Sequence, residues 1–154
     1  MPDVHDKATR SRNMSAIRGK DTKPEILIRK ELHRRGFRFR LHDKRLPGKP
    51  DIVLPKHSAV IQVNGCFWHG HDCSLFKVPG TRTEFWLEKI GQNKDRDKRN
   101  SLALKAAGWR EAIVWECALK RSASTQELDN LGRKITEWLL SGEESLVIDE
   151  NRSK

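Results

Sequence analysis

The sequence contains little cysteine and no long apolar run. No stretch of its 154 residues approaches the roughly 20 apolar residues that a membrane-spanning helix requires. The first residues lack the apolar segment of a secretory signal, so we expect a cytoplasmic protein without a membrane partner. Thiols stay reduced inside cells, and three cysteines is an odd number, so a disulfide framework is not expected.

Charge is abundant and unevenly divided. Lysine and arginine number 31 against 21 aspartate and glutamate residues, which gives a net charge of +10. Such an excess on a short chain favours a polyanionic partner, most commonly nucleic acid, over a charge that only keeps the protein soluble. With 36% hydrophobic residues, the chain has enough apolar side chains for the core of one domain.

Segments with helical and with strand character alternate along the chain. Capping-box patterns at Thr22–Glu25 and Thr81–Glu84 predict helices that run to about residues 35 and 107, and a third helical pattern covers residues 128–139. Strands are predicted at residues 37–41, 51–54, 59–63 and 111–116. We therefore expect an α/β fold with a central mixed sheet flanked by helices on both faces.

The predicted folded domain covers residues 23–142. Residues 1–22 form a polar, basic arm, in which Met14 and Ile17 are spaced for one short helical face. The arm is either a disordered tail or a clamp that becomes ordered on DNA. Residues 143–154 are expected to form a flexible C-terminal tail.

Three cysteines and one histidine have the chemistry of a metal site. Cys66, His71 and Cys73 lie close together, and Cys117 ends a distant predicted strand. Three thiolates and one imidazole suit a closed tetrahedral zinc site, which would rigidify a loop that has little apolar content. The alternative is three unrelated buried thiols, and His69 competes with His71 as the nitrogen ligand.

A second candidate site centres on Asp51. This carboxylate begins a strand after a Pro-Gly turn, with Val63 on the neighbouring strand and Glu25 on the first helix. Oxygen ligands of this kind suit Mg²⁺, and His69 is the natural proton acceptor because imidazole titrates near neutrality. Taken alone, such residues more often have simpler roles: a turn residue for Asp51, a capping partner for Glu25 and a solvated loop histidine for His69.

Three aromatic residues are candidates for contacts with bases. Phe67 and Trp68 lie within residues 65–73, the cysteine–histidine loop, and Trp86 follows on the next predicted helix. Large exposed rings beside a basic surface are typical of stacking on bases or wedging between base pairs. Ordinary core packing is the alternative.

Several long motifs resemble the very short patch repair endonucleases. They are Ser11-x-Asn13-Met14-x-x-Ile17, Asp21-Thr22-x-x-Glu25, residues 46–51 (LPGKPD), 64–69 (NGCFWH), 76–79 (FKVP), 81–90 (TRTEFWLEKI) and 114–119 (VWECAL). The similarity runs from about residue 3 to residue 140. It implies a restriction-endonuclease-like fold and a Mg²⁺-dependent nick on the 5′ side of the mispaired T at T:G mismatches, which arise when 5-methylcytosine deaminates.

The resemblance also implies roles for individual residues. Asp51 and the backbone carbonyl of Val63 would bind Mg²⁺, His69 would serve the attacking water, and Glu25 would support the hydrated metal. The structural zinc would be held by Cys66, His71, Cys73 and Cys117. Phe67, Trp68 and Trp86 would intercalate beside the mismatch from the major groove, while the arm with Met14 and Ile17 would close over the minor groove. A monomer that acts on nucleoid DNA, with the mismatch-repair machinery as a further partner, is expected.

Two residues depart from the family pattern. Val63 stands where relatives carry threonine, and Asn64 stands where they carry histidine. Only a backbone carbonyl is required at Val63, whereas Asn64 cannot exchange a proton near pH 7. Two rival functions remain: a related nuclease of different mismatch or sequence specificity, and a zinc-stabilised DNA-binding module without catalysis.

Overall fold

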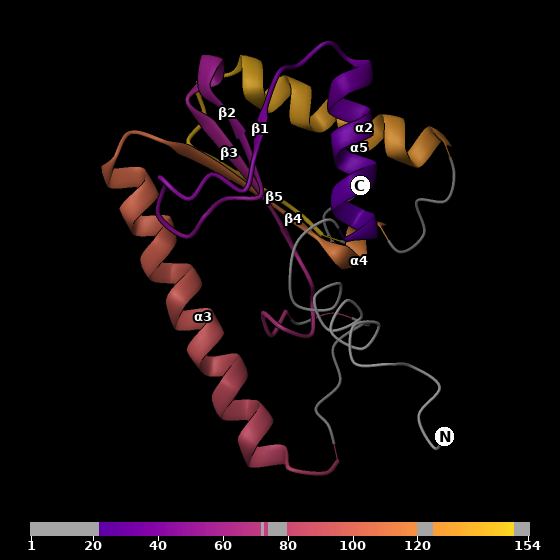
Figure 1. Ribbon diagram of the computed structural model, residues 1–154. Coiled ribbons are helices and arrows are strands. Elements are labelled where there is room, and N and C mark those ends of the chain that lie inside the picture. Colours follow the sequence, from indigo (N-terminus) through magenta and orange to yellow (C-terminus); the bar gives the residue numbers. More distant parts are fainter. Residues whose placement is uncertain (1–21, 72, 74–79, 120–124, 150–154) are drawn as a thin grey trace, which may run out of the picture.

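The computed structural model describes residues 22–71, 73, 80–119 and 125–149. Its centre is a five-stranded mixed sheet in the order β1-β2-β3-β4-β5 (Figure 1). The strands are β1 (Arg40–Leu41), β2 (Ile52–Leu54), β3 (Ala59–Asn64), β4 (Arg110–Trp115) and β5 (Ser145–Ile148). The pairs β1–β2 and β2–β3 are antiparallel, while β3–β4 and β4–β5 are parallel. The predicted fold class is confirmed.

Helices cover both faces of this sheet. They are α2 (Lys23–Arg34), α3 (Thr83–Ala106), the short α4 (Glu116–Leu119) and α5 (Thr125–Leu140), with a 3-10 turn η1 (Pro55–His57) between β2 and β3. The main core lies between one face and helices α2 and α5. A smaller core, formed by Val53, Val60 and Leu104, lies between the other face and α3. Ile52 and Leu54 face the main core while Val53 faces the smaller one, as the two-residue period of a strand requires.

Helix α2 begins as its sequence predicts. Thr22 is the N-cap and accepts a hydrogen bond from the Glu25 amide at 3.4 Å, and Pro24 occupies the first turn. Ile28 and Leu32, one turn apart, are fully buried against the sheet. The helix ends before Gly36, whose φ of +86° is left-handed and costs glycine little.

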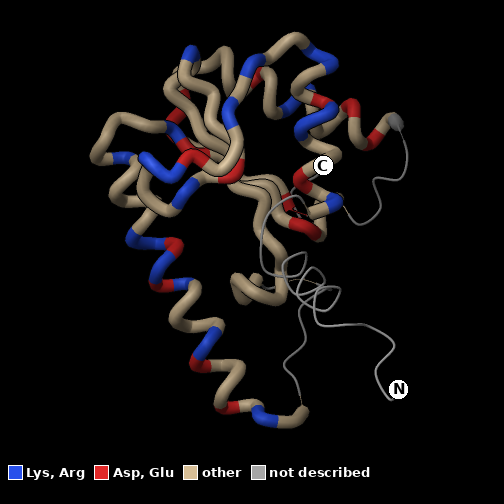
Figure 2. Tube along the Cα trace, in the orientation of Figure 1, with Lys and Arg blue, Asp and Glu red and all other residues tan. Residues whose placement is uncertain are grey.

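Helix α3 does not begin as predicted. Its N-cap is Arg82, with a left-handed φ of 54°, and no side chain caps the helix. The expected capping box at Thr81 is therefore wrong, because Thr81 lies one residue too early to reach the first turn. Only the C-terminal part of α3, around Leu104, packs on the sheet. The rest projects away from it beside the cysteine–histidine loop and carries charges of both signs (Figures 1 and 2).

The C-terminal segment belongs to the sheet for part of its length. Residues 145–148 form β5, which pairs in parallel with β4 from Glu111↔Ser145 to Val114↔Ile148. Ile148 is 2% exposed and joins the main core. The expectation of a flexible tail from residue 143 is corrected for these residues, because burying Ile148 and pairing with β4 hold them in place. Within the residues that the structure describes, no helix is both long and apolar enough to cross a bilayer.

Candidate active site and metal centre

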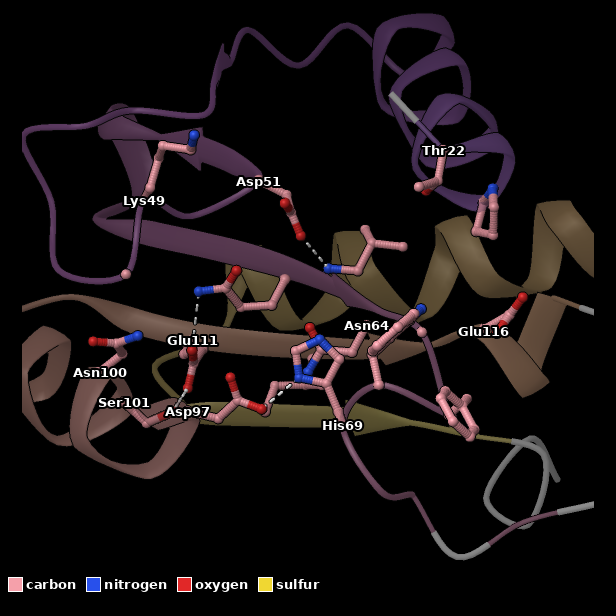
Figure 3. Close-up of a pocket in the computed structure, with 18 of the residues that line it drawn as sticks. Thr22, Lys49, Asp51, Asn64, His69, Asp97, Asn100, Ser101, Glu111 and Glu116 are labelled. Atoms are coloured by element: carbon pink, nitrogen blue, oxygen red, sulfur yellow. Dashed lines mark hydrogen bonds and ion pairs between the residues drawn. The ribbon is translucent and has the colours of Figure 1, made fainter. Parts of the chain in front are cut away.

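A cleft of about 620 Å³ opens where β2 begins and β3 ends (Figure 3). Parts of α2, the turn before β2, the cysteine–histidine loop and α3 line it. Among the residues that the sequence singled out, Asp51, Val63, Phe67, Trp68 and His69 all border this cleft. Segments distant in sequence are thus brought to one place by the antiparallel β2–β3 pair and by the loop that follows β3.

The carboxylate of Asp51 is held by the neighbouring strand. Its Oδ2 atom accepts a hydrogen bond from the Val63 amide at 2.7 Å (Figure 3). Burial raises the pKa of Asp51 to about 6, with a further contribution from the nearby Glu25, and this outweighs the lowering by the Val63 amide and by the nearby His42 and His69. Burial beside a second carboxylate therefore disfavours the charged form of Asp51, and a bound cation would offset this.

Glu25 and His42 lie next to Asp51. Glu25 is 1% exposed, and its Oε2 atom lies 2.8 Å from Nε2 of His42 and in contact with Arg29. One ligand atom each from Glu25, His42 and Asp51 lies within 4.8 Å of the others, so the three residues are able to hold one metal ion. Glu25 is more than a capping partner, since one of its carboxylate oxygens lies within 4.8 Å of ligand atoms of both His42 and Asp51.

His69 pairs with a residue that the sequence analysis overlooked. Its Nδ1 atom lies 2.5 Å from Oδ2 of Asp97 on α3 (Figure 3). A carboxylate at Nδ1 fixes that nitrogen as the protonated one, which leaves Nε2 as a proton acceptor. The loop that carries His69 is itself tied to α3, because Asn93 donates to the Trp68 carbonyl at 2.8 Å.

A second group of residues that could hold a metal ion consists of the four that the family resemblance implies. Ligand atoms of Cys66, His71, Cys73 and Cys117 all lie within 4.8 Å of one another. Cys117 stands on α4, two residues after β4 ends, rather than on the strand itself. Burial raises the pKa of the Cys66 thiol well above its usual range, so without a cation this sulfur stays protonated. Three sulfurs and one nitrogen at this spacing suit a closed site for a soft or borderline divalent metal.

The histidine of this group is held from several sides. His71 Nδ1 faces the sulfur of Cys117 at 3.5 Å, its Nε2 faces the Asp149 carboxylate at 3.2 Å, and its ring stacks on Trp115 at 4.1 Å between centroids. In the part of the chain that the structure describes, His69 does not belong to this group of ligand atoms. Gly70, between the two histidines, has a left-handed φ of +62°, and a side chain there would collide with Ile90 of α3.

The three predicted stacking residues form one aromatic cluster. Phe67, Trp68 and Trp86 meet edge to face, with ring centroids 5.2 to 5.7 Å apart, and all three are partly exposed. Phe85 adds a fourth ring against Trp86 at 5.1 Å. None of the three belongs to either hydrophobic core of the described residues. The predicted arm residues Met14 and Ile17 lie outside the described residues.

The comparisons with known proteins identify the family of the chain. A family model described as "DNA mismatch endonuclease Vsr" matches residues 2–75. The chain is 51% identical over 150 residues to DNA mismatch endonuclease Vsr of Escherichia coli K12, covering 97% of this chain and 95% of that protein. The chain belongs to the Vsr family of DNA mismatch endonucleases. This confirms the predicted family and the expectation of an endonuclease.

Other Vsr-like relatives carry the name of nicking enzymes. The chain is 47% identical over 136 residues to the type II nicking enzyme V.NmeAIP of Neisseria meningitidis serogroup A, covering 88% of this chain and 97% of the relative. It is 51% identical over 106 residues to the type II nicking enzyme V.XorIIP of Xanthomonas oryzae pv. oryzae, covering 69% of this chain and 78% of the relative. The similarity to the first two relatives spans nearly the whole of each.

Three side chains of the site were absent from the sequence-based prediction: His42, Asp97 and Asp149. His42 could have been found only from the register of the β1–β2 pair. Asp97 lies in a run of charges along α3 that otherwise reads as a solvated face. Asp149 follows a strand that the sequence did not indicate.

Proposed function

We propose that this member of the Vsr family nicks duplex DNA on the 5′ side of the mispaired T in a T:G mismatch, by Mg²⁺-dependent hydrolysis. The observation that carries the proposal is the arrangement of Asp51, the His69–Asp97 pair and the aromatic cluster around one cleft. Each part has a separate task in cutting a phosphodiester beside a distorted base pair.

Asp51 and the backbone carbonyl of Val63 are the proposed ligands of Mg²⁺, with Glu25 supporting its bound water. The donor set fits the ion, because carboxylate and carbonyl oxygens are its preferred ligands. When bound, Mg²⁺ stabilises the negative charge of the scissile phosphate and lowers the pKa of a water. The hydrogen bond from the Val63 amide orients Asp51, so the rest of its carboxylate group faces the cleft.

His69 is the proposed proton acceptor for the attacking water. Its Nδ1–H donates to Asp97, so Nε2 is the basic atom, and the same carboxylate stabilises the imidazolium that forms when the proton is taken. The 2.5 Å contact also fixes the orientation of the ring.

Zinc held by Cys66, His71, Cys73 and Cys117 has a structural role in this proposal. The chain offers all four ligands of a tetrahedral site, which leaves no position for a substrate. The site links the loop after β3 to α4, and that loop carries Phe67, Trp68 and His69 between its ligands. A rigid loop holds the rings and the base in fixed relation to each other.

Phe67, Trp68 and Trp86 are proposed to enter the base stack beside the mismatch from the major groove. Their edge-to-face contacts would have to open to admit bases, and the stacking of rings on bases compensates for that loss. The arm with Met14 and Ile17 is proposed to close over the minor groove. The net charge of +10 supplies attraction to phosphates.

The test is a panel of labelled DNA hairpins incubated with protein and Mg²⁺, with Asp51→Ala as the matched variant. We expect a single nick 5′ of the T in the T:G hairpin by the wild-type protein only, while both proteins bind it. Nicking of T:A or G:A duplexes at equal rates would favour a related nuclease of other specificity. Binding by both proteins with no nick from either would leave a DNA-binding module without catalysis.

A further inference from the structure

The register of the β1–β2 pair places His42 directly across from Asp51. Leu41 pairs with Ile52 in the antiparallel ladder, so the next residues outward are His42 and Asp51. The His42 amide donates to the Asp51 carbonyl at 3.1 Å, which continues the ladder by one hydrogen bond. Beyond it the chain turns sharply, because His42 has a left-handed φ of 47°, which non-glycine residues seldom adopt.

The side chain of His42 is fixed between two carboxylates. Its Nε2 atom lies 2.8 Å from Oε2 of Glu25, and only 11% of the side chain is exposed. Asp51 is close enough for His42 to lower its pKa. Three separate elements, α2, the end of β1 and the start of β2, therefore converge on one small volume with two oxygen donors and one nitrogen donor.

We infer that His42 supplies a direct nitrogen ligand to the cation bound by Asp51 and Glu25, so that the cleft prefers Mn²⁺ to Mg²⁺. The inference rests on the proposed function, because it concerns the same cation site. It adds a ligand that the assignment of Asp51 and Val63 does not include, and it makes Glu25 a ligand rather than a support for bound water.

The spacing of the three groups fits one shared ion. Two ligands at right angles around an octahedral ion with bonds of about 2.1 Å lie roughly 3 Å apart, and opposite ligands lie about 4.2 Å apart. The 2.8 Å between His42 Nε2 and Glu25 Oε2, which is a hydrogen-bond distance without an ion, is close to the first value, and all three ligand atoms lie within 4.8 Å of one another. Two carboxylates also balance the charge of a divalent cation.

The kinds of donor atom decide which cation is preferred. Mg²⁺ is a hard ion that favours oxygen and keeps its waters, whereas imidazole nitrogen binds transition metals better. Mn²⁺ accepts both kinds of donor in octahedral geometry. Arg29 contacts Oε2 of Glu25, the same oxygen that faces His42, and lowers the negative charge available to the ion. Binding of a hard ion depends on charge, so this contact lowers the affinity for Mg²⁺ more than the affinity for an ion that also bonds to nitrogen.

Direct binding of Mn²⁺ tests the inference without DNA. Full-length protein with its zinc site loaded is titrated with Mn²⁺ and followed by electron paramagnetic resonance, and Mg²⁺ affinity is read from competition. We expect His42→Gln to weaken Mn²⁺ binding at least about tenfold and Mg²⁺ binding less than about threefold. Glutamine at position 42 keeps a hydrogen-bonding group near Glu25. The matched control is His57→Gln, at the end of β2 opposite to Asp51, and its affinities should be unchanged.

Pulsed measurements on the bound Mn²⁺ identify the ligand itself. Coupling to a ¹⁴N nucleus is expected in the wild-type protein and in His69→Gln, and it is expected to be absent from His42→Gln. Mn²⁺ bound by the wild type without ¹⁴N coupling would overturn the inference even if the His42 variant failed to fold. Coupling that survives in His42→Gln, or equal losses of Mn²⁺ and Mg²⁺ affinity, would also overturn it and leave His42 to orient Glu25.

Nicking assays on the same preparations separate this inference from the proposed function. If the bound Mn²⁺ shows ¹⁴N coupling but the protein nicks no T:G duplex, the cation site is supported and the proposed reaction is refuted. Nicking by wild-type protein whose Mn²⁺ shows no ¹⁴N coupling would refute the role of His42 alone.

Discussion

Asp149 Oδ2 lies 3.2 Å from Nε2 of His71, and both side chains are only 12% exposed. His71 turns its other nitrogen, Nδ1, towards the Cys117 sulfur. A ring nitrogen that faces a carboxylate carries the proton, so Nδ1 is the atom left to bind a metal. The C-terminal strand β5, which ends just before Asp149, thus supports the cysteine–histidine site.

Replacing Asp149 should loosen zinc without removing a ligand. We expect Asp149→Asn to lower zinc affinity by about 10–100-fold, because the carboxylate both orients His71 and makes its imidazole a better donor. The measurement is competition with a chromogenic chelator on the folded protein. Glu144→Gln is the matched control, since Glu144 is an exposed carboxylate just before β5 that pairs with Lys105. Equal zinc affinities for wild type and Asp149→Asn would mean that the contact is incidental.

The raised pKa of Asp51 predicts how stability depends on pH when no cation occupies the cleft. The native carboxyl holds its proton up to about pH 6, whereas an unfolded aspartate releases it near pH 3.9. Between these values the native state binds more protons, so the free energy of unfolding contributed by Asp51 falls as pH rises from about 4 to 6, and this loss persists above pH 6.

Asp51→Asn should therefore stabilise the cation-free protein at pH 7, by about 1–3 kcal/mol, and leave it little changed at pH 4. Urea unfolding of zinc-loaded protein in buffer without Mg²⁺ or Mn²⁺ gives the difference at each pH. Adding Mg²⁺ should raise the stability of the wild type only. A variant that is less stable than the wild type at pH 7 would contradict the prediction.

The contact between His69 and Asp97 predicts an ordered series of rates. His69→Ala should lower the nicking rate by about 10²–10⁴-fold, as the loss of a general base does. Asp97→Asn should lower it less, because the imidazolium loses its anionic partner while the base itself remains. Single-turnover nicking measured across pH tests both. Asp95→Asn, two residues earlier on α3, is the control, and an Asp97→Asn profile that matches it would exclude the pair from catalysis.

Local patterns in the sequence were sufficient for the parts of the fold that depend on neighbours in the chain. Thr22 and Glu25 indicate the start of α2 because a cap is a contact across three residues. Cys66, His71 and Cys73 indicate a metal site because all three lie on one loop. The capping pattern at Thr81 failed, since the left-handed Arg82 turns the chain after Thr81 and starts the helix later.

Contacts that depend on register or on distant elements were not predictable in the same way. His42 reaches Asp51 only because β1 pairs with β2 in one particular register. The strand β5 is short and follows polar residues, so its pattern is weak, and it is stabilised by pairing with β4 and by burial of Ile148. Tertiary packing decided both cases.

The aromatic cluster leads to a prediction about recognition rather than chemistry. If Trp68 and Trp86 enter the base stack, Trp68→Ala and Trp86→Ala should each weaken binding to a T:G duplex about tenfold or more, the usual cost of losing one ring–base stack. Binding to a fully paired duplex depends mainly on phosphate contacts and should change much less. Fluorescence anisotropy with both duplexes at two salt concentrations separates these contributions. Leu102→Ala is the matched control, because Leu102 is 61% exposed on α3, the helix that carries Trp86. Equal losses on both duplexes would assign the two tryptophans to packing within the loop, and loss of bound zinc in either variant would show that the rings support the metal site instead of the mismatch.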